Sequence, residues 1–406
     1  MRKKLKKITK ILGALGMSLA VLVTSSVAGY ASEQQLTEEK IARIKEMAKE
    51  NDYLRDVDDF ESEEAYKKYL EFQGISCKDS NNAIATYSSV KKVEAKLGIK
   101  LKGLKPDANK PEIEQAMSLP IQTFYMGSSY VYIVQKSGST VYLSRMEYST
   151  DKKEATFKDK MILKKFGHCQ TLQYFEWKNK PYFLMTCKDD GGAHTNEDGR
   201  AYYWATELAR VQYEPKKSYD YMHFKRLCQL SKANTEGTAI GTAKRCDGAL
   251  SSDKKTLLVW CKTTQNKMQF ARYNLNDVNK ALDNSDKMYV SCGSLKEKCL
   301  ASCTPSANEV FGNVESSSMQ GLELNDANNT YIANGENSKN KYIIKLGKTA
   351  KFSSAIGISN SNLVAKTNTE IEGLQLKGDN VYFGICNHNE KGQGIQYIYY
   401  VSKNVF

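Results

Sequence analysis

Apolar and polar residues alternate with a period of two through most of the chain from about residue 118 onward. This period places one face of a segment in a core and the other toward solvent, which indicates β-strands. Turns rich in Asn, Asp, Gly and Lys separate the segments. The stretch "SMQGLELNDANNTYIAN" at 318–334, for example, is typical of one β-hairpin. The body of the protein is therefore predicted to be all-β.

The same hairpin pattern occurs five times, and each copy begins with an oxygen-bearing residue, a small residue and an apolar residue. The copies begin "IQTFYMGSSYVYIVQ", "CQTLQYFEWKNKPYFLMTC", "CDGALSSDKKTLLVWC", "MQGLELNDANNTYIAN" and "IEGLQLKGDNVYFGIC". Chance similarity is the alternative explanation, because hairpin signals are degenerate. Their spacing fits four-stranded units and predicts a five-bladed β-propeller over residues 106–406. The oxygen-bearing residues, called the polar ring below, are Gln122, Gln170, Asp247, Gln320 and Glu372.

The first strand of each blade in a propeller lies nearest the axis, where neighbouring sheets crowd together. A small residue such as Gly321 at this point lets two backbones approach each other. The polar residue before it is expected to face a water-filled central channel, because solvation there removes the cost of burying five polar groups.

Residues 1–105 follow different patterns. Residues 1–31 combine a basic start, an apolar stretch and small residues, which predicts a secretory signal cleaved after Ala31 and an exported protein. An uncleaved anchor is the alternative, although Ser, Thr and Gly interrupt the apolar run early. Residues 32–105 are predicted to form a small α-helical extension, with helices at 36–51 and 62–73 and a third at 87–97.

Charge narrows the possible partners only slightly. The formal net charge of +13 falls to +7 without residues 1–31, which carry six basic and no acidic residues. A mild positive charge favours approach to an anionic membrane or wall surface. It does not indicate nucleic-acid binding.

Several phrases of the sequence are familiar in their order and spacing. "GHCQTLQYFEWKNKPYFL", "WATELARVQY", "ALSSDKKTLLVWCKTTQNKMQFARYNLNDVNKALD" and "SMQGLELNDANNTYIAN" resemble the helveticin J family of large, heat-labile class III bacteriocins. The resemblance covers roughly residues 118–402. It implies a secreted antibacterial protein that binds a cell-surface glycan or another envelope component of related bacteria. It implies no enzyme, no cofactor and no catalytic residue.

The polar ring admits two roles. Five oxygen-bearing side chains at one mouth could bind sugar hydroxyls, an amine or a cation, or they could tie the inner strands together. His168, beside the second ring residue, could line the same mouth or lie solvated at a strand end. The alternative function is a secreted glycan-binding or glycan-hydrolysing propeller. Hydrolysis needs two carboxylates, and only Asp247 and Glu372 supply them, since an amide cannot transfer a proton.

The ten cysteines admit disulfides in an exported protein. Cys169 and Cys187 occupy facing positions of one hairpin, and Cys246 and Cys261 occupy the same positions of the next. Two cross-strand bridges are predicted here, with buried thiols as the alternative. Three further cysteines in "CGSLKEKCLASC" could form one bridge plus a free thiol, or a weak metal site. Their spacing and the lack of a nearby His are poor for zinc, so no metal is expected.

Overall fold

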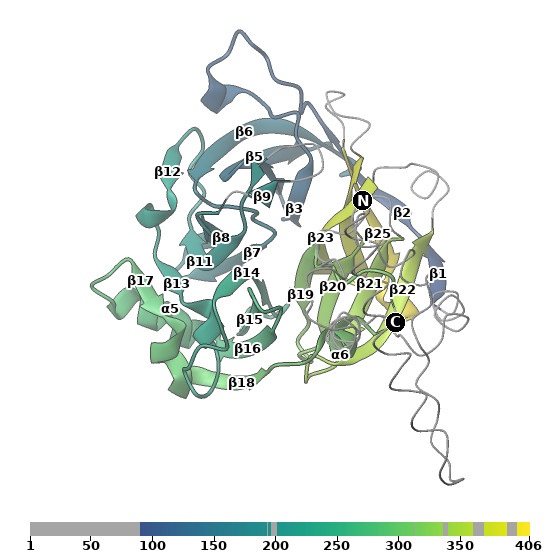
Figure 1. Ribbon diagram of the computed structural model, residues 1–406. Coiled ribbons are helices and arrows are strands. Elements are labelled where there is room, and N and C mark those ends of the chain that lie inside the picture. Colours follow the sequence, from purple (N-terminus) through teal and green to yellow (C-terminus); the bar gives the residue numbers. More distant parts are fainter. Residues whose placement is uncertain are drawn as a thin grey trace, which may run out of the picture. The chain divides into compact units, whose positions relative to one another are not determined.

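β-Strands make up most of the structure (Figure 1). This confirms the all-β prediction for the body of the chain. The computed structural model describes residues 90–192, 194–195, 201–312, 314–335, 340–359, 369–387 and 396–406. The predicted signal at 1–31 and the predicted helices at 36–51 and 62–73 lie outside the described residues.

Consecutive strands pair antiparallel in runs of four. Each hairpin that opens a run is one of the repeats found in the sequence. The first run is β3 (Ile121–Met126), β4 (Tyr130–Ser137), β5 (Thr140–Tyr148) and β6 (Glu154–Lys164), and the second is β7 (Leu172–Trp177), β8 (Lys180–Asp189), β11 (Ala205–Val211) and β13 (Arg226–Cys228). The third is β14 (Ala243–Leu250), β15 (Thr256–Thr263), β16 (Met268–Asn274) and β18 (Cys299–Cys303), and the fourth is β19 (Gly321–Leu324), β20 (Thr330–Asn334), β21 (Tyr342–Leu346) and β22 (Phe352–Ser359). The fifth is β23 (Thr369–Lys377), β24 (Asn380–Asn387), β25 (Gln396–Ser402) and β2 (Lys96–Lys102).

The remaining elements extend or connect these runs. Three short strands add to outer edges in parallel: β12 (Ser218–Asp220) to β6, β17 (Tyr289–Ser291) to β13, and β1 (Lys91–Glu94) to β22. The others are the hairpin of β9 (His194–Thr195) and β10 (Ala201–Tyr202), the helices α5 (Leu275–Asn284) and α6 (Ala307–Phe311), and the 3-10 turns Glu112–Glu114, Tyr221–His223, Leu230–Lys232, Cys292–Lys298 and Lys403–Val405.

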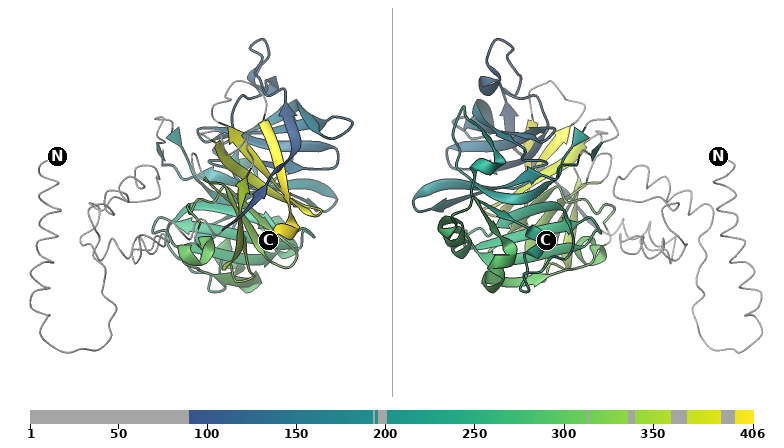
Figure 2. Two further views of the ribbon diagram at one scale, coloured as in Figure 1. Left: turned by 90° about the vertical axis from the view of Figure 1, so that its right-hand side faces the viewer. Right: turned by 60° about the vertical axis from the view of Figure 1, so that its left-hand side comes forward.

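The first and last described segments of the chain lie side by side. Strand β2 pairs antiparallel with β25 and parallel with β6, which joins the fifth run to the first in one sheet (Figure 2). The helix predicted at 87–97 is therefore wrong over residues 91–97, and the helical extension cannot reach residue 105. Ile99 and Leu101 are buried, whereas Lys100 and Lys102 between and after them are half-buried. This alternation is that of a strand.

Apolar side chains fill the junction between each run and the next. Val134 of the first run packs in one cluster with Phe183 of the second, and Trp260 of the third packs with Leu322 of the fourth. Clusters of the same kind join the second run to the third, the fourth to the fifth, and the fifth to the first. The cores thus lie between sheets, and each sheet is covered on both faces.

The first strands of the runs approach each other closely (Figure 1). The amide of Gly373 in the fifth run donates to the carbonyl of Gln320, at the start of the fourth run, at 2.7 Å. A Cβ added at Gly321 would lie 2.8 Å from backbone atoms of Gly373, and one added at Gly373 would lie 2.7 Å from the Cα of Thr123. The prediction that small residues permit this approach is confirmed at these positions.

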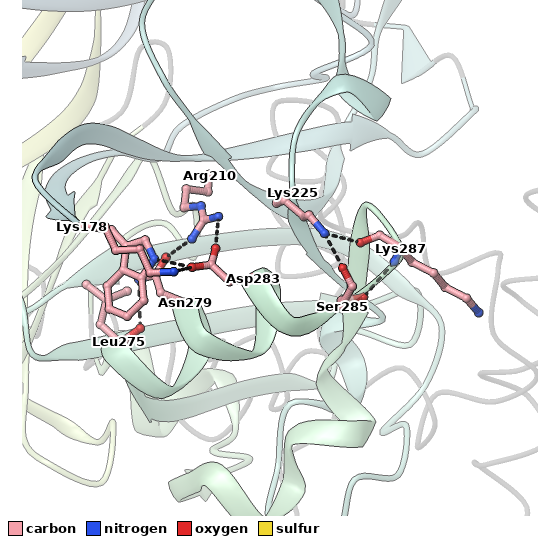
Figure 3. A network of polar contacts seen from close by, with 9 residues as sticks. Lys178, Arg210, Lys225, Leu275, Asn279, Asp283, Ser285 and Lys287 are labelled. Atoms are coloured by element: carbon pink, nitrogen blue, oxygen red, sulfur yellow. Dashed lines mark hydrogen bonds and ion pairs between the residues drawn. The ribbon is translucent and has the colours of Figure 1, made fainter.

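Helix α5 follows β16 and is attached to the second run by Asp283 and by Asn279, whose Oδ1 accepts from Arg210 Nη1 at 2.9 Å (Figure 3). Asp283 accepts hydrogen bonds from Trp177 Nε1 at 2.8 Å and Arg210 Nη2 at 2.6 Å, and Lys178 Nζ lies 2.8 Å away. Partial burial acts to raise the pKa of Asp283, but contacts from Lys178, Trp177 and Arg210 hold it well below its usual value. The helix begins at an Asn274 side-chain cap.

The contact between inner strands predicts that Gly321→Ala is strongly destabilising. The new methyl group would press on backbone that cannot rotate away. We expect the free energy of unfolding to fall by about 2 kcal/mol or more, the upper part of the range for overpacking. Chemical denaturation measures this difference. The matched control is Gly192→Ala, where nothing lies within 4 Å of the added Cβ. Equal effects at both positions would contradict a close inner-strand contact.

Candidate functional site

The polar ring lies at the start of the inner strands, and four of its five members are brought together. Gln170 Nε2 donates to Glu372 Oε2 at 2.8 Å and to Gln320 Oε1 at 3.2 Å. The neighbour of Gln170, Thr171, donates from Oγ1 to Asp247 Oδ1 at 3.0 Å. These bonds connect the second, third, fourth and fifth runs. Three ring side chains therefore bond to each other directly, and Asp247 is connected to them through Thr171.

Arg245 joins the same network from strand β14. Its Nη2 contacts Gln170 Oε1 and the carbonyl of Met319, and it lies 3.6 Å from Asp247 Oδ2. The positively charged guanidinium of Arg245 lies among carboxylate and amide oxygens, and such charge-assisted hydrogen bonds are stronger than neutral ones. The sequence-based interpretation did not include Arg245. It precedes Asp247 by two residues in one strand, so the alternation of side chains could have indicated it.

Gln122 is the ring member that the network does not include. Its Nε2 donates weakly to the adjacent Ile121 carbonyl at 3.4 Å, and its Oε1 has no partner among the described residues. Its strand joins the others through backbone contact, because Thr123 packs against Gly373. The structure therefore brings together four ring residues by side-chain bonds and the fifth by its backbone.

Burial changes the expected chemistry of the ring. The ring side chains are between 1% and 7% exposed. The expectation that they face a water-filled channel is therefore wrong. Burial raises the pKa of Asp247 to about 6, although Arg245 and Thr171 act to lower it. Burial, and then the neighbouring Glu370, raise the pKa of Glu372 well above its usual value and so favour its neutral form.

His168 lies at the ring end of the inner strands but not at a solvated strand end. Its ring stacks on the indole of Trp204, with centroids 4.9 Å apart and planes 12° apart. Neither ring nitrogen has a partner among the described residues, and both are shielded from solvent. Burial, together with the nearby Lys136 and Arg245, lowers the pKa of His168 well below its usual value. No local sequence pattern predicts the contact between His168 and Trp204.

A second polar tier lies three residues further along three of the inner strands. Its members are Gln173, Glu323 and Gln375, and each is at most 9% exposed. Gln173 Nε2 donates to Glu323 Oε1 at 2.5 Å, the Leu376 amide donates to Glu323 Oε2 at 3.3 Å, and the Met126 amide donates to Gln375 Oε1 at 2.7 Å. Burial raises the pKa of Glu323 to about 7 against the opposing effects of Lys254 and Gln173.

One family comparison decides the relationship of this chain to known proteins. The sequence model of the family described as bacteriocin helveticin-J matches residues 107–404. The chain belongs to the helveticin J family. The resemblance noted in the sequence is thereby confirmed, and a bacteriocin-like role follows from it. No curated protein matches the chain.

Solved structures give this helveticin J family protein only remote matches. A hydrazine synthase of Kuenenia stuttgartiensis is 9% identical over 73% of this chain and 66% of its own, with a TM-score of 0.31. A glycosyl hydrolase from Bacteroides ovatus is 8% identical over 77% and 95%, with a TM-score of 0.40. The WD40 domain of Toxoplasma gondii coronin is 9% identical over 77% and 77%, with a TM-score of 0.31. Similarity at this level carries no argument about fold or function.

The four candidate disulfide cysteines of this helveticin J family protein are free thiols in the structure, so the predicted bridges are not formed. Cys246 and Cys261 do face each other across β14 and β15, as predicted. All four are fully buried, and burial raises the pKa of Cys169 to about 12, which disfavours the reactive thiolate. The alternative of buried thiols thus describes these positions.

Neither a metal cluster nor a membrane-spanning helix was found within the described ranges. No group of three His, Cys, Asp or Glu residues there is placed to hold an ion, and no helix there is long and apolar enough to cross a bilayer.

The raised pKa of Glu323 predicts that stability falls as pH rises. The folded state holds a proton on Glu323 up to about pH 7, whereas the unfolded state loses it near pH 4.5. Folding is therefore favoured below pH 4.5, and that advantage is lost progressively up to pH 7. Glu323→Gln removes this ionisation, so the variant should gain on the order of 2–3 kcal/mol relative to wild type between pH 4 and pH 8. Urea denaturation at both pH values measures the gain.

The control for this experiment is Glu297→Gln, because the Glu297 side chain is 84% exposed. Its stability difference from wild type should not change between pH 4 and pH 8. A Glu323→Gln variant with the same pH dependence as wild type would show that Glu323 does not titrate in this range.

Proposed function

We propose that this helveticin J family member is a secreted antibacterial protein that binds a surface component of target bacteria without catalysis. The family match over residues 107–404 is the observation that carries the proposal. The proposed export rests on the signal-like pattern of residues 1–31 and on the secretion that is typical of this family. The mild positive charge of the remaining chain suits the anionic envelope of a bacterium.

The proposed scaffold is a five-bladed β-propeller with each antiparallel run as one blade. Three features support it: the first strands of the runs contact one another, apolar clusters fill the junctions between successive runs, and β2 joins the last run to the first. Closure by a strand from the opposite end of the chain would hold such a ring together. It would also leave the starts of the inner strands at one end, which is where ligands of radial folds bind.

The absence of catalysis is proposed from the engagement of the two carboxylates. A glycosidase needs two carboxylates with a sugar between them, one of them acting on a water or directly on the sugar. Asp247 is held by Thr171 and Arg245, and Glu372 is held by Gln170. Both are at most 2% exposed. This packing favours a structural role for the ring over glycan hydrolysis, which is the alternative function.

Growth inhibition and polysaccharide cleavage, measured on the same preparation, test the proposal. The purified protein should inhibit neighbouring Gram-positive species and bind their cells, and it should release no reducing ends from their walls. The variant with Asp247→Asn and Glu372→Gln is the matched comparison. Near-ultraviolet circular dichroism should first show that the variant keeps the native fold.

Cleavage of a wall polysaccharide by wild type but not by the double amide variant would contradict the non-catalytic proposal and support the alternative. Failure of the folded protein to bind or inhibit any of the species tested would contradict the antibacterial proposal itself.

A further inference from the structure

Four nitrogen-bearing side chains gather beside the polar ring and form what is called here the donor cluster: Lys136, His168, Trp204 and Arg245. Trp204 is the common neighbour of His168 and Arg245. The His168 ring stacks on its indole at 4.9 Å, and Arg245 Cζ lies 4.3 Å from the centre of the same indole. Lys136 is the electrostatic neighbour of His168 and of Glu372. The cluster thus lies directly against the ring.

The donor cluster has buried hydrogen-bond capacity that the ring does not use. Arg245 Nε, Trp204 Nε1 and both ring nitrogens of His168 have no partner among the described residues. Arg245 and Trp204 can only donate, and a buried donor without an acceptor costs about 1–3 kcal/mol. An unpaired acceptor next to Trp204 is Asp190 Oδ1, from the residue whose backbone amide donates to the Trp204 carbonyl at 2.9 Å. Arg245 Nε and Trp204 Nε1 therefore remain two neighbouring buried donors that no described residue satisfies.

Arg245 and Lys136 are the two cations of the cluster, and the carboxylates near them are Asp247, Glu372 and Glu370. Arg245 already neutralises Asp247 at 3.6 Å, and burial favours the neutral form of Glu372. Burial lowers the pKa of Lys136, while Glu372 and Glu370 act to raise it. A second anion brought to Arg245 and Lys136 would gain charge-assisted hydrogen bonds, which are about twice as strong as neutral ones.

The members of the donor cluster differ in how deeply they are buried. Lys136 and His168 are half-buried residues, whereas Trp204 and Arg245 are only 4% and 5% exposed. A ligand group would therefore approach past Lys136 and His168 and end on the N–H groups of Trp204 and Arg245. An anionic oxygen group on a flexible polymer suits this approach, because it is smaller than a sugar ring and needs less displacement of the packed side chains.

We propose that the donor cluster binds the anionic oxygen group, a phosphodiester or a carboxylate, of an envelope glycopolymer. This rests on the proposed function, because it names the chemical class of the surface component. Lys136 attracts the group, Arg245 and Trp204 donate to its oxygens, and His168 fixes the Trp204 ring by stacking. The polar ring holds Arg245 in place through Gln170 and Asp247.

Binding of three purified polymers to the full-length protein tests the proposal. The polymers are poly(glycerol phosphate), polygalacturonate and neutral dextran, compared by isothermal titration calorimetry at low and high salt. At least one anionic polymer should bind, more weakly at high salt, and dextran should not. The polymer that binds more tightly distinguishes a phosphodiester from a carboxylate.

Two variants place the binding on the cluster. Trp204→Phe removes the Nε1–H donor and keeps an aromatic ring for His168 and Arg245, and Lys136→Met removes the outermost cation. Each should weaken binding about tenfold or more, the equivalent of one charge-assisted hydrogen bond. The matched control is Lys165→Met, which removes the same charge from an exposed residue three positions before His168. It should change binding less than twofold.

The proposal is overturned if neither anionic polymer binds, if dextran binds equally well, or if Lys136→Met and Trp204→Phe behave like Lys165→Met. Melting temperatures of the variants show whether each is folded. If Trp204→Phe is unfolded, Lys136→Met alone decides. Cell binding without anionic-polymer binding would refute this subsite and leave the antibacterial function standing. Polymer binding that depends on the cluster, in a protein that inhibits no bacterium, would support this subsite and contradict the antibacterial function.

Discussion

Backbone contact between the inner strands is the constraint on which the rest of the structure depends. Gly373 lies against Gln320 and Thr123, and Gly321 lies against Gly373, at distances that leave no room for a side chain. Strands this close cannot be separated by apolar side chains, so polar groups meet at their ends. Most of those groups bond to each other, since an unpaired buried polar group is expensive. The bonds of Gln170 and Arg245 follow from this need.

The same constraint explains why the ring is not itself an open binding surface. Close packing pairs Asp247 with Arg245, favours the neutral form of Glu372 and shields both carboxyl groups from solvent. Under the binding proposal, a ligand would instead meet side chains beside the ring, such as Trp204 and Lys136. The ring residues thus link the inner strands, while neighbours such as Trp204 keep hydrogen-bond donors that have no partner among the described residues.

Much of the inner-strand arrangement could be predicted from sequence, because a repeated pattern of polar, small and apolar residues reports a repeated local environment. Arg245 was missed although its position two residues before Asp247 was visible. Trp204 could not have been found, because its stacking on His168 joins two residues that lie far apart in the sequence and no local pattern encodes such a contact. The helix predicted at 87–97 failed over its described part because "KKVEAKL" at 91–97 consists mostly of good helix formers, although its apolar residues alternate with charged ones.

The disulfide prediction shows the limit of pairing arguments. Register correctly placed Cys246 opposite Cys261, but facing positions are necessary for a bridge and not sufficient. These thiols pack in the apolar cluster between the second and third runs, where they act as small core residues. Burial also explains why the second polar tier was missed, since a glutamate such as Glu323 in a strand is normally expected to face solvent.

Native-state hydrogen exchange of two amides tests the central claim most directly. The amides of Gly373 and Gly248 donate to Gln320 and Thr171 of neighbouring runs. If the inner strands hold the structure together, both should exchange only through global unfolding, with an opening free energy equal to that from denaturation. The outer amide of Ile162, which donates to Lys217, should open at lower free energy. Inner amides that exchange through local openings, while Ile162 stays protected, would contradict the account.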